Sequence, residues 1–233
     1  MQRMHHSVLG RAAALAVLAT AFLAADHGSA RAGVIRGTLA LSAGRLTFSG
    51  RNGGADHSRP QPGVTDAVIY VERIPEKTER KLTGHGWFFT RRADVPRMIQ
   101  ADLQFVPRVM SIAAGTSVEF LNLDRVYHNP FSVSAARRFD LGKNAPGRTD
   151  TVTFGRPGVV NLHCEIHPEM TGYVVVVPNH AFTRPDSLGG FALPKLPDGD
   201  YVVHAWHPRH GDITQHVTLD RHGDVELELA FKP

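Results

Sequence analysis

Residues 158–177 read GVVNLHCEIHPEMTGYVVVV, and this stretch carries most of the information about the fold. Two valine-rich runs flank a short polar segment, which is typical of neighbouring β-strands joined by a loop. Side chains alternate along a strand, so Val160, Leu162 and Cys164 are expected on one face. We therefore predict that Cys164 points into a core at the end of the first strand, and that residues 165–171 form the connecting loop.

Similar runs recur through the rest of the chain. They are rich in Val, Ile, Phe and Thr and lie between clusters of Gly, Pro, Asn and Asp. The clearest are GVIRGTLAL, DAVIYVER, TSVEFLNL, DTVTF, DYVVHAW, DITQHVTL and VELELAF. No segment beyond the first 32 residues shows strong helical periodicity, and residues 51–63 have the composition of a mobile loop. The pattern predicts an all-β protein built from sandwiches or barrels.

The first 32 residues have the layout of a signal peptide. A basic start with Arg3 and Arg11 precedes the apolar run AAALAVLATAFLAA, and Ala30-Arg31-Ala32 offers a small-residue cleavage site. The apolar run is shorter than the about 20 residues that span a bilayer, and no later run is longer. We expect a periplasmic chain that is cleaved near Ala32 and has no membrane span.

The charge distribution argues against a nucleic-acid partner. The 233 residues carry a formal net charge of +4, and three arginines and one aspartate of the leader account for half of it. The remaining basic residues are interspersed with acidic ones instead of forming one stripe.

Cys164 is the only cysteine, so it cannot form a disulfide within the chain. Exported proteins usually pair their cysteines, which leaves a metal ligand, a reactive thiol or an inert core residue as interpretations. The loop after Cys164 brings His167 and Met170 close to the sulfur, and His128 follows the strand TSVEFLNLD at what we expect to be the same end of the sandwich. Two imidazoles, one thiolate and a weak axial methionine are typical of a blue-copper site. Calcium and magnesium prefer oxygen ligands, and structural zinc is held by cysteine, histidine or carboxylate ligands.

These motifs resemble those of the cupredoxin family. The pattern V-x-F-x-N-x-D is followed by His128-Asn129, and C-x-x-H-x-x-M-x-G follows a Pro-Gly turn, with a loop spacing most similar to that of amicyanin. The resemblance covers residues 98–179 and implies a Greek-key β-sandwich that binds one type 1 copper ion. It implies His128, Cys164, His167 and Met170 as ligands, and an Asn129 side chain that ties the two ligand loops together. Pro130 departs from the family, because plastocyanin-like proteins usually have valine there and proline donates no backbone hydrogen bond.

The flanking segments resemble a second family. The run G-x-F-x-L-x-x-L-P-x-G-x-Y, which begins at Gly189, is similar to the transthyretin-like modules called carboxypeptidase regulatory-like domains. We predict one discontinuous β-sandwich from residues 33–97 and 180–233, with the copper domain inserted. Bacterial proteins of this layout are often named methylamine utilisation proteins, a label that says nothing about a substrate.

Several functions share the predicted ligands. The leading hypothesis is a periplasmic carrier of single electrons between redox protein partners, and not an enzyme. The alternatives are a carrier that hands copper on and a surface binding module with structural copper. The sequence lacks the H-x-H pairs of multicopper oxidases, and Cys164 has no evident orienting group for catalysis as a nucleophile. His204, His207 and His210 are spaced by three residues, so a strand does not gather them, and we predict structural or surface roles.

Overall fold

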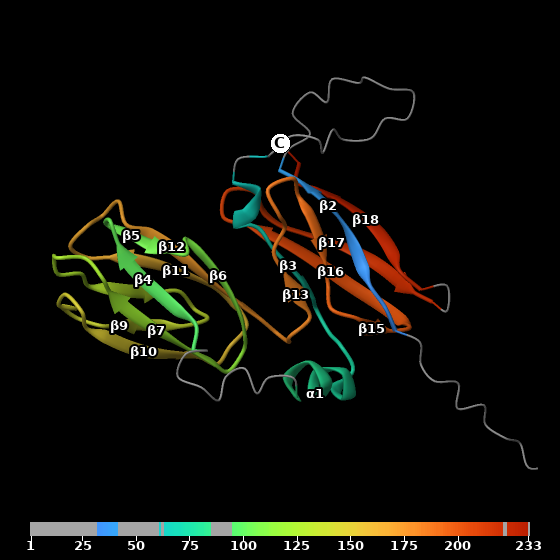
Figure 1. The fold of residues 1–233 in the computed structure, drawn as a ribbon, viewed down its shortest axis with the longest axis horizontal. Helices are drawn as coiled ribbons and strands as arrows, with labels where there is room; N and C mark the ends of the chain where they lie inside the picture. The colour runs from blue at the N-terminus through green and yellow to red at the C-terminus, as the bar shows by residue number, and fades with distance from the viewer. Residues whose placement is uncertain (1–31, 42–60, 62, 85–94, 221–222, 233) are drawn as a thin grey trace, which may run out of the picture.

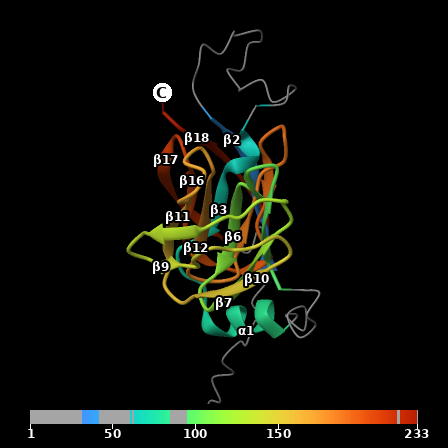
Figure 2. The ribbon, with the colours of Figure 1, turned by 90° about the vertical axis from the view of Figure 1, so that its left-hand side faces the viewer.

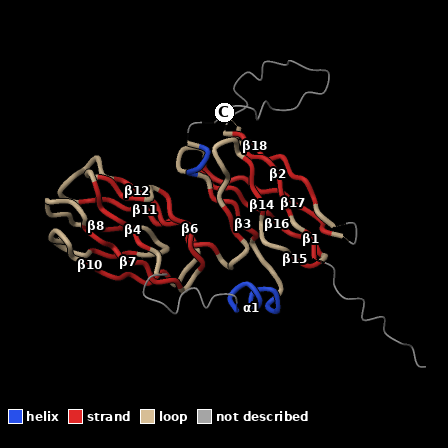
Figure 3. Tube along the Cα trace, in the orientation of Figure 1, coloured by secondary structure: helices blue, strands red, loops and turns tan. Residues whose placement is uncertain are grey.

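The structure is a computed structural model, and it describes residues 32–41, 61, 63–84, 95–220 and 223–232. Residues 1–31 of the predicted 32-residue leader, and most of the predicted mobile loop at residues 51–63, lie outside the described residues. Strands dominate the fold, as Figure 3 shows in red, so the all-β prediction is confirmed. The strands form two β-sandwiches that lie side by side (Figure 1).

The first sandwich is built from one continuous stretch of chain. Its smaller sheet has the order β10-β7-β4-β5 and its larger sheet the order β6-β12-β11-β8-β9. Figure 2 views this sandwich from its own side, with the second one behind it. The strands are β4 (Arg97–Ala101), β5 (Gln104–Val106), β6 (Val109–Ala113), β7 (Thr116–Asn122), β8 (Pro130–Val133), β9 (Arg138–Asp140), β10 (Thr149–Phe154), β11 (Gly158–Cys164) and β12 (Thr171–Val177).

Alternating side chains fill the core of this sandwich. On β11, Val160, Leu162 and Cys164 are all buried, and they pack in one cluster with Phe120 and Phe154. The prediction that Cys164 points into the core is therefore confirmed. The antiparallel pairing of β11 with β12 leaves residues 165–170 as the connecting loop, which confirms the prediction except that Thr171 already belongs to β12.

The second sandwich combines segments from both ends of the described chain. Its sheets have the orders β13-β3-β16-β17 and β14-β2-β18, with a short pair β1-β15. The strands are β1 (Ala32–Gly33), β2 (Ile35–Ala40), β3 (Val68–Val71), β13 (Phe182–Thr183), β14 (Gly190–Ala192), β15 (Leu196–Pro197), β16 (Gly199–His207), β17 (Gly211–Leu219) and β18 (Val225–Ala230). A 3-10 turn, η1 (Val64–Asp66), precedes β3.

Strand β2 pairs only with later segments of the chain. It lies parallel to β18 and antiparallel to β14. A Cβ atom on Gly37 would lie only 1.8 Å from the carbonyl oxygen of Leu227, so this close approach requires glycine. β3 also pairs with later strands, and it is antiparallel to both β16 and β13.

The structure contains one helix that the sequence pattern did not predict. Helix α1 spans Glu76–Gly84 and carries mostly charged residues. Leu82 is its only large apolar residue, so no apolar face repeats at the helical period. The helix begins after Pro75, and an ion pair of 2.7 Å joins Arg80 to Glu76 one turn earlier.

Valines and aromatic rings fill the contact between the two sandwiches. Val68 of the second sandwich packs with Val109, Val175 and Val177 of the first. A salt bridge of 2.5 Å from Arg108 to Asp66 lies beside this cluster. Within the part of the chain that the structure describes, no helix is long and apolar enough to cross a membrane.

Candidate metal centre

Backbone contacts fix His128 at one end of the first sandwich. It lies just before β8 and forms an isolated bridge with Asn144. The amide of His128 donates to the Asn144 carbonyl at 3.1 Å, and the Asn144 amide donates back at 2.6 Å. The His128 side chain is fully buried, so its ring has one well-defined position.

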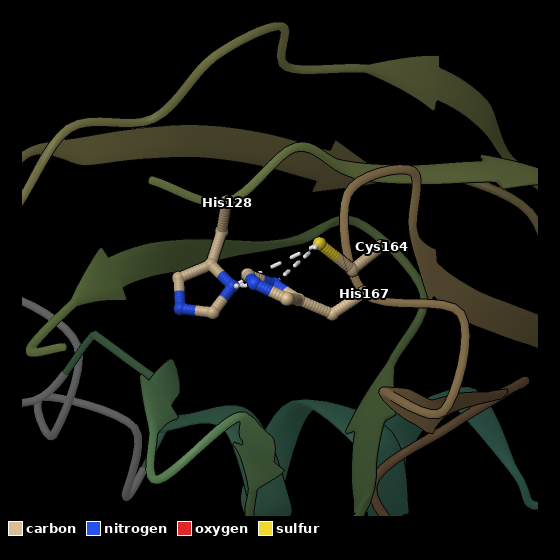
Figure 4. Close-up of side chains that lie close together, drawn as sticks. All are labelled: His128, Cys164 and His167. Carbon is tan, nitrogen blue, oxygen red and sulfur yellow. Dashed lines mark hydrogen bonds between the residues drawn. The ribbon is translucent and has the colours of Figure 1, made fainter. Parts of the chain in front are cut away.

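His128, Cys164 and His167 come together, although 36 residues separate the first from the second. The Cys164 sulfur lies 3.8 Å from Nδ1 of His128 and 3.7 Å from Nδ1 of His167, and the two nitrogens are 3.1 Å apart. Figure 4 shows the three side chains converging: His128 comes from the loop before β8, Cys164 from the end of β11 and His167 from the loop that follows β11. His128 and Cys164 are buried, whereas His167 is half-buried.

The size of this triangle suits a single metal ion. Bonds to a divalent ion such as zinc are about 2.0–2.1 Å from imidazole nitrogen and about 2.3 Å from thiolate sulfur. With angles near 120°, two nitrogens would then be about 3.5 Å apart and a nitrogen and the sulfur about 3.8 Å apart. The two nitrogen–sulfur distances match these values, and the two nitrogens would have to move apart by about 0.4 Å. The residues therefore fit the metal that the motif predicts with a small adjustment.

Met170 lies at the end of the same loop, directly before β12. Its amide donates to the His167 carbonyl at 3.0 Å, which closes the loop into a tight turn. The side chain is buried and packs in the same core cluster as Cys164. This position is compatible with an axial ligand, and that role stays a prediction.

Asn129 connects the two loops that carry the triangle. Its backbone amide points at the Cys164 sulfur at 3.4 Å, and its side-chain Nδ2 donates to the Glu165 carboxylate at 2.6 Å. The Glu165 amide in turn donates to the Asn129 carbonyl at 3.1 Å. The missing amide proton of Pro130 does not break this connection, because both backbone bonds are made by Asn129.

Asp124 lies beside the site. In the sequence it was noted only as the last residue of the V-x-F-x-N-x-D motif. Its carboxylate lies 2.8 Å from Nε2 of His128 and accepts hydrogen bonds from the amides of Asp102 and Leu103 at 2.7 and 3.1 Å. Burial would raise the pKa of Asp124, but the bonds from Leu103, His128 and Asp102 outweigh burial and lower it. The carboxylate therefore stays ionised beside the ring of His128.

Large apolar side chains are exposed in the loops that carry the metal centre. Leu123, Val126 and Tyr127 precede His128, and Ile166 precedes His167; their exposed fractions range from 41% to 58%. Pro130, two residues after His128, is buried. The signal in the sequence for this apolar surface was the group of apolar residues in the loop before His128.

His163, His204 and His207 make their contacts away from this centre. His204 stacks on Tyr70 with ring centroids 4.7 Å apart, and His207 is buried with Nε2 donating to the Gly63 carbonyl at 3.1 Å. His163 lies on the opposite face of β11 from Cys164, and its ring contacts Phe131. In the described ranges, no second group of three histidine, cysteine or acidic side chains is close enough to share a metal ion.

The fold and this set of side chains define a copper protein of the cupredoxin class, and comparison with known proteins agrees. The model of the family "Copper binding proteins, plastocyanin/azurin family" matches residues 93–177. Plastocyanin from Ulva arasakii is 36% identical over 74 residues, which cover 28% of this chain and 76% of the plastocyanin. The chain therefore belongs to the plastocyanin/azurin family, whose members bind copper and are generally electron carriers.

Two solved copper proteins match part of this chain. A reduced mutant of amicyanin is 22% identical with a TM-score of 0.34, and the match covers 38% of this chain and 88% of amicyanin. A copper-containing nitrite reductase from Thermus scotoductus SA-01 is 29% identical with a TM-score of 0.34, over 35% of this chain. This chain spans only 22% of the length of that reductase.

Proposed function

We propose that the protein carries single electrons between redox proteins through one type 1 copper ion. The observation that supports this most is the convergence of one sulfur and two ring nitrogens within 4.8 Å of one another. A copper ion bound there would supply the Cu(II)/Cu(I) couple. The set of two histidines, one cysteine and a weak methionine is that of blue-copper electron-transfer sites.

The chain's own residues account for the rigidity that such a site needs. His128 is held by two backbone hydrogen bonds and full burial, and Cys164 ends a central strand of the larger sheet. His167 and Met170 are joined by the tight turn of the ligand loop. A preorganised set of ligands changes little between oxidation states, so each transfer requires little rearrangement.

Electrons would enter through the half-buried His167. The exposed side chains of Leu123, Tyr127 and Ile166 in the two ligand loops would form a small apolar docking surface. Redox proteins that meet briefly bury less than about 1,200 Å² in total, so a small surface is sufficient. The partner would be a redox protein in the same compartment, which we propose to be the periplasm because residues 1–32 have the pattern of a signal peptide.

We also propose that the second sandwich is one discontinuous, transthyretin-like domain interrupted by the copper domain. The pairing of β2 with β14 and β18 supports this division, as does the pairing of β3 with β13 and β16. Continuous apolar packing within this sandwich, from Ile35 to Phe231, supports it as well. Controlled proteolysis should release a fragment close to residues 98–179 if the division is correct.

Copper carriage is the alternative function, and the partial exposure of His167 favours it. The two functions differ in how firmly the protein holds its metal. An electron carrier should keep copper in the presence of a competing chelator and exchange electrons rapidly between its two oxidation states. A metal carrier should release copper to the chelator within the time of mixing.

The test is a copper titration followed by visible spectroscopy. One equivalent of Cu(II) should produce an intense thiolate-to-copper band in the wild-type protein, and Cys164→Ser should remove it because the copper–sulfur bond creates it. His216→Ala, at an exposed position on β17 of the second sandwich, is the matched control and should keep the band. An undiminished band in the Cys164→Ser protein would refute the proposed site.

A further inference from the structure

Asp124 is the only described side chain with a negative charge that contacts a ligand ring of the proposed centre. Its carboxylate lies 2.8 Å from Nε2 of His128, on the side of the ring opposite Nδ1. A carboxylate can only accept hydrogen bonds, so Nε2 must carry the proton. The lone pair of His128 is then on Nδ1, which faces the Cys164 sulfur.

The carboxylate itself is held in place by a tight turn of another strand pair. The amides of Asp102 and Leu103, in the turn between β4 and β5, both donate to it. Both residues have positive φ angles, 51° and 58°, which aim successive amides to the same side. The Asp124 amide donates to Oδ1 of Asn122 at 2.9 Å, which fixes the start of the loop. Asp124 therefore has little freedom to move away from the ring.

A full negative charge in this position has an electrostatic consequence. The oxidised form of a one-electron metal centre carries one more positive charge than the reduced form. An ionised carboxylate behind a ligand ring stabilises the oxidised form more, and it also makes the imidazole a stronger donor. The Asp124 side chain is only 15% exposed, so water screens the charge incompletely.

We infer that Asp124 is a positioning residue that selects the Nε2-protonated tautomer of His128 and lowers the reduction potential of the centre. This inference rests on the proposed function, because it concerns the metal held by His128. Asp124 adds an anionic contact to the proposed ligand set. Through Asp124, the turn at Asp102 and Leu103 influences the electronic properties of the site.

The test compares Asp124→Asn with Asp140→Asn. Asp140 lies in the same sandwich and caps the amide of Gly142 with one hydrogen bond of 2.9 Å, so its variant removes an equal charge at an exposed position. Asp124→Asn should shift the electron equilibrium with a one-electron mediator at least tenfold toward reduced protein, which corresponds to about 59 mV. The Asp140→Asn shift should be less than half as large. Equal shifts in the two variants would overturn the inference.

A second measurement uses the metal-free protein, so that it remains informative if the copper proposal fails. Nitrogen NMR of the His128 ring should show the proton on Nε2 in the wild type and a mixture of tautomers in Asp124→Asn. Asp124→Glu should restore part of the wild-type potential by returning the charge. An unchanged tautomer in Asp124→Asn would overturn the positioning role, whereas the absence of a visible copper band in the wild type would overturn the proposed function alone.

Discussion

The hydrogen bond between Asn129 and Glu165 offers a quantitative test of how the two ligand loops are held together. The bond joins Nδ2 of Asn129 to a carboxylate oxygen at 2.6 Å, and Asn129 is buried whereas Glu165 is exposed. Hydrogen bonds to charged groups contribute about 1.5–3 kcal/mol, and the exposure of Glu165 reduces this one to the lower limit or slightly below it, about 1–1.5 kcal/mol. The Oδ1 atom of Asn129 is buried and has no hydrogen-bond partner among the described residues, so its removal offsets part of the loss.

The assay is a double-mutant cycle on the metal-free protein. Urea unfolding of the wild type, Asn129→Ala, Glu165→Ala and the double variant gives four free energies of unfolding. We expect each single variant to lose about 1 kcal/mol and the coupling energy to be about 1–1.5 kcal/mol. A coupling energy below about 0.3 kcal/mol, the error with which independent sites add, would mean that this contact does not hold the loops together.

Three further outcomes follow from the site and the core. Met170→Leu should keep the visible band but raise the reduction potential, because a lost axial donor destabilises Cu(II) more than Cu(I). A tenfold shift of the equilibrium toward reduced protein corresponds to about 59 mV. An unchanged or lower potential would remove Met170 from the ligand set. Pro168 is exposed and directly follows His167, so Pro168→Glu adds charge beside the proposed docking surface and not at the metal. This variant should slow electron self-exchange severalfold and leave the spectrum intact; equal rates at matched ionic strength would place electron entry elsewhere. Burial lowers the pKa of His207 below its usual 6.5, so the folded protein binds this proton less well than the unfolded chain does. The stability contributed by neutral His207 should be complete above pH 6.5 and decline below it, by up to about 1.4 kcal/mol per pH unit. His207→Gln should flatten the plot of unfolding free energy against pH. Parallel plots for the two proteins would contradict this prediction.

The sequence predicted the parts of the fold that depend on local pattern. The alternation on β11 placed Cys164 in the core, and the short spacing to the next strand predicted the loop with His167 and Met170. Helix α1 was missed because its charged residues create no apolar period. Local pattern identifies a strand or a tight loop well, but it does not detect a helix whose apolar contacts are few.

Contacts between distant segments were harder to predict. Asp124 meets the turn at Asp102 because β4 lies parallel to β7, and the sequence carries no signal for that pairing. The exposed group around Tyr127 was overlooked because apolar residues in a loop can equally be buried. Pro130 is buried because it pairs with Cys164 across two strands, and the local sequence carries no signal for that pairing. These features depend on which strands become neighbours, and that is decided by the packing of the complete sandwich.

The interruption of the second sandwich also affects the order in which the chain can fold. The hydrogen bond from the Val34 amide to Asp224 closes a loop of 190 residues, and the parallel pairing of β2 with β18 spans a similar distance. Residues 97–177 can complete the first sandwich from contacts that are nearer in sequence. Once this sandwich has folded, it shortens the effective loop between β2 and β18. Each halving of the loop length lowers the entropic cost of closing it by about 0.6 kcal/mol. During synthesis β2 and β3 must therefore stay unpaired until β13 and β14 emerge, and the second edge of β2 remains open until β18 emerges. A chain that stops after Val177 would retain the whole metal centre but expose two apolar strands, so it should aggregate although its copper site is complete.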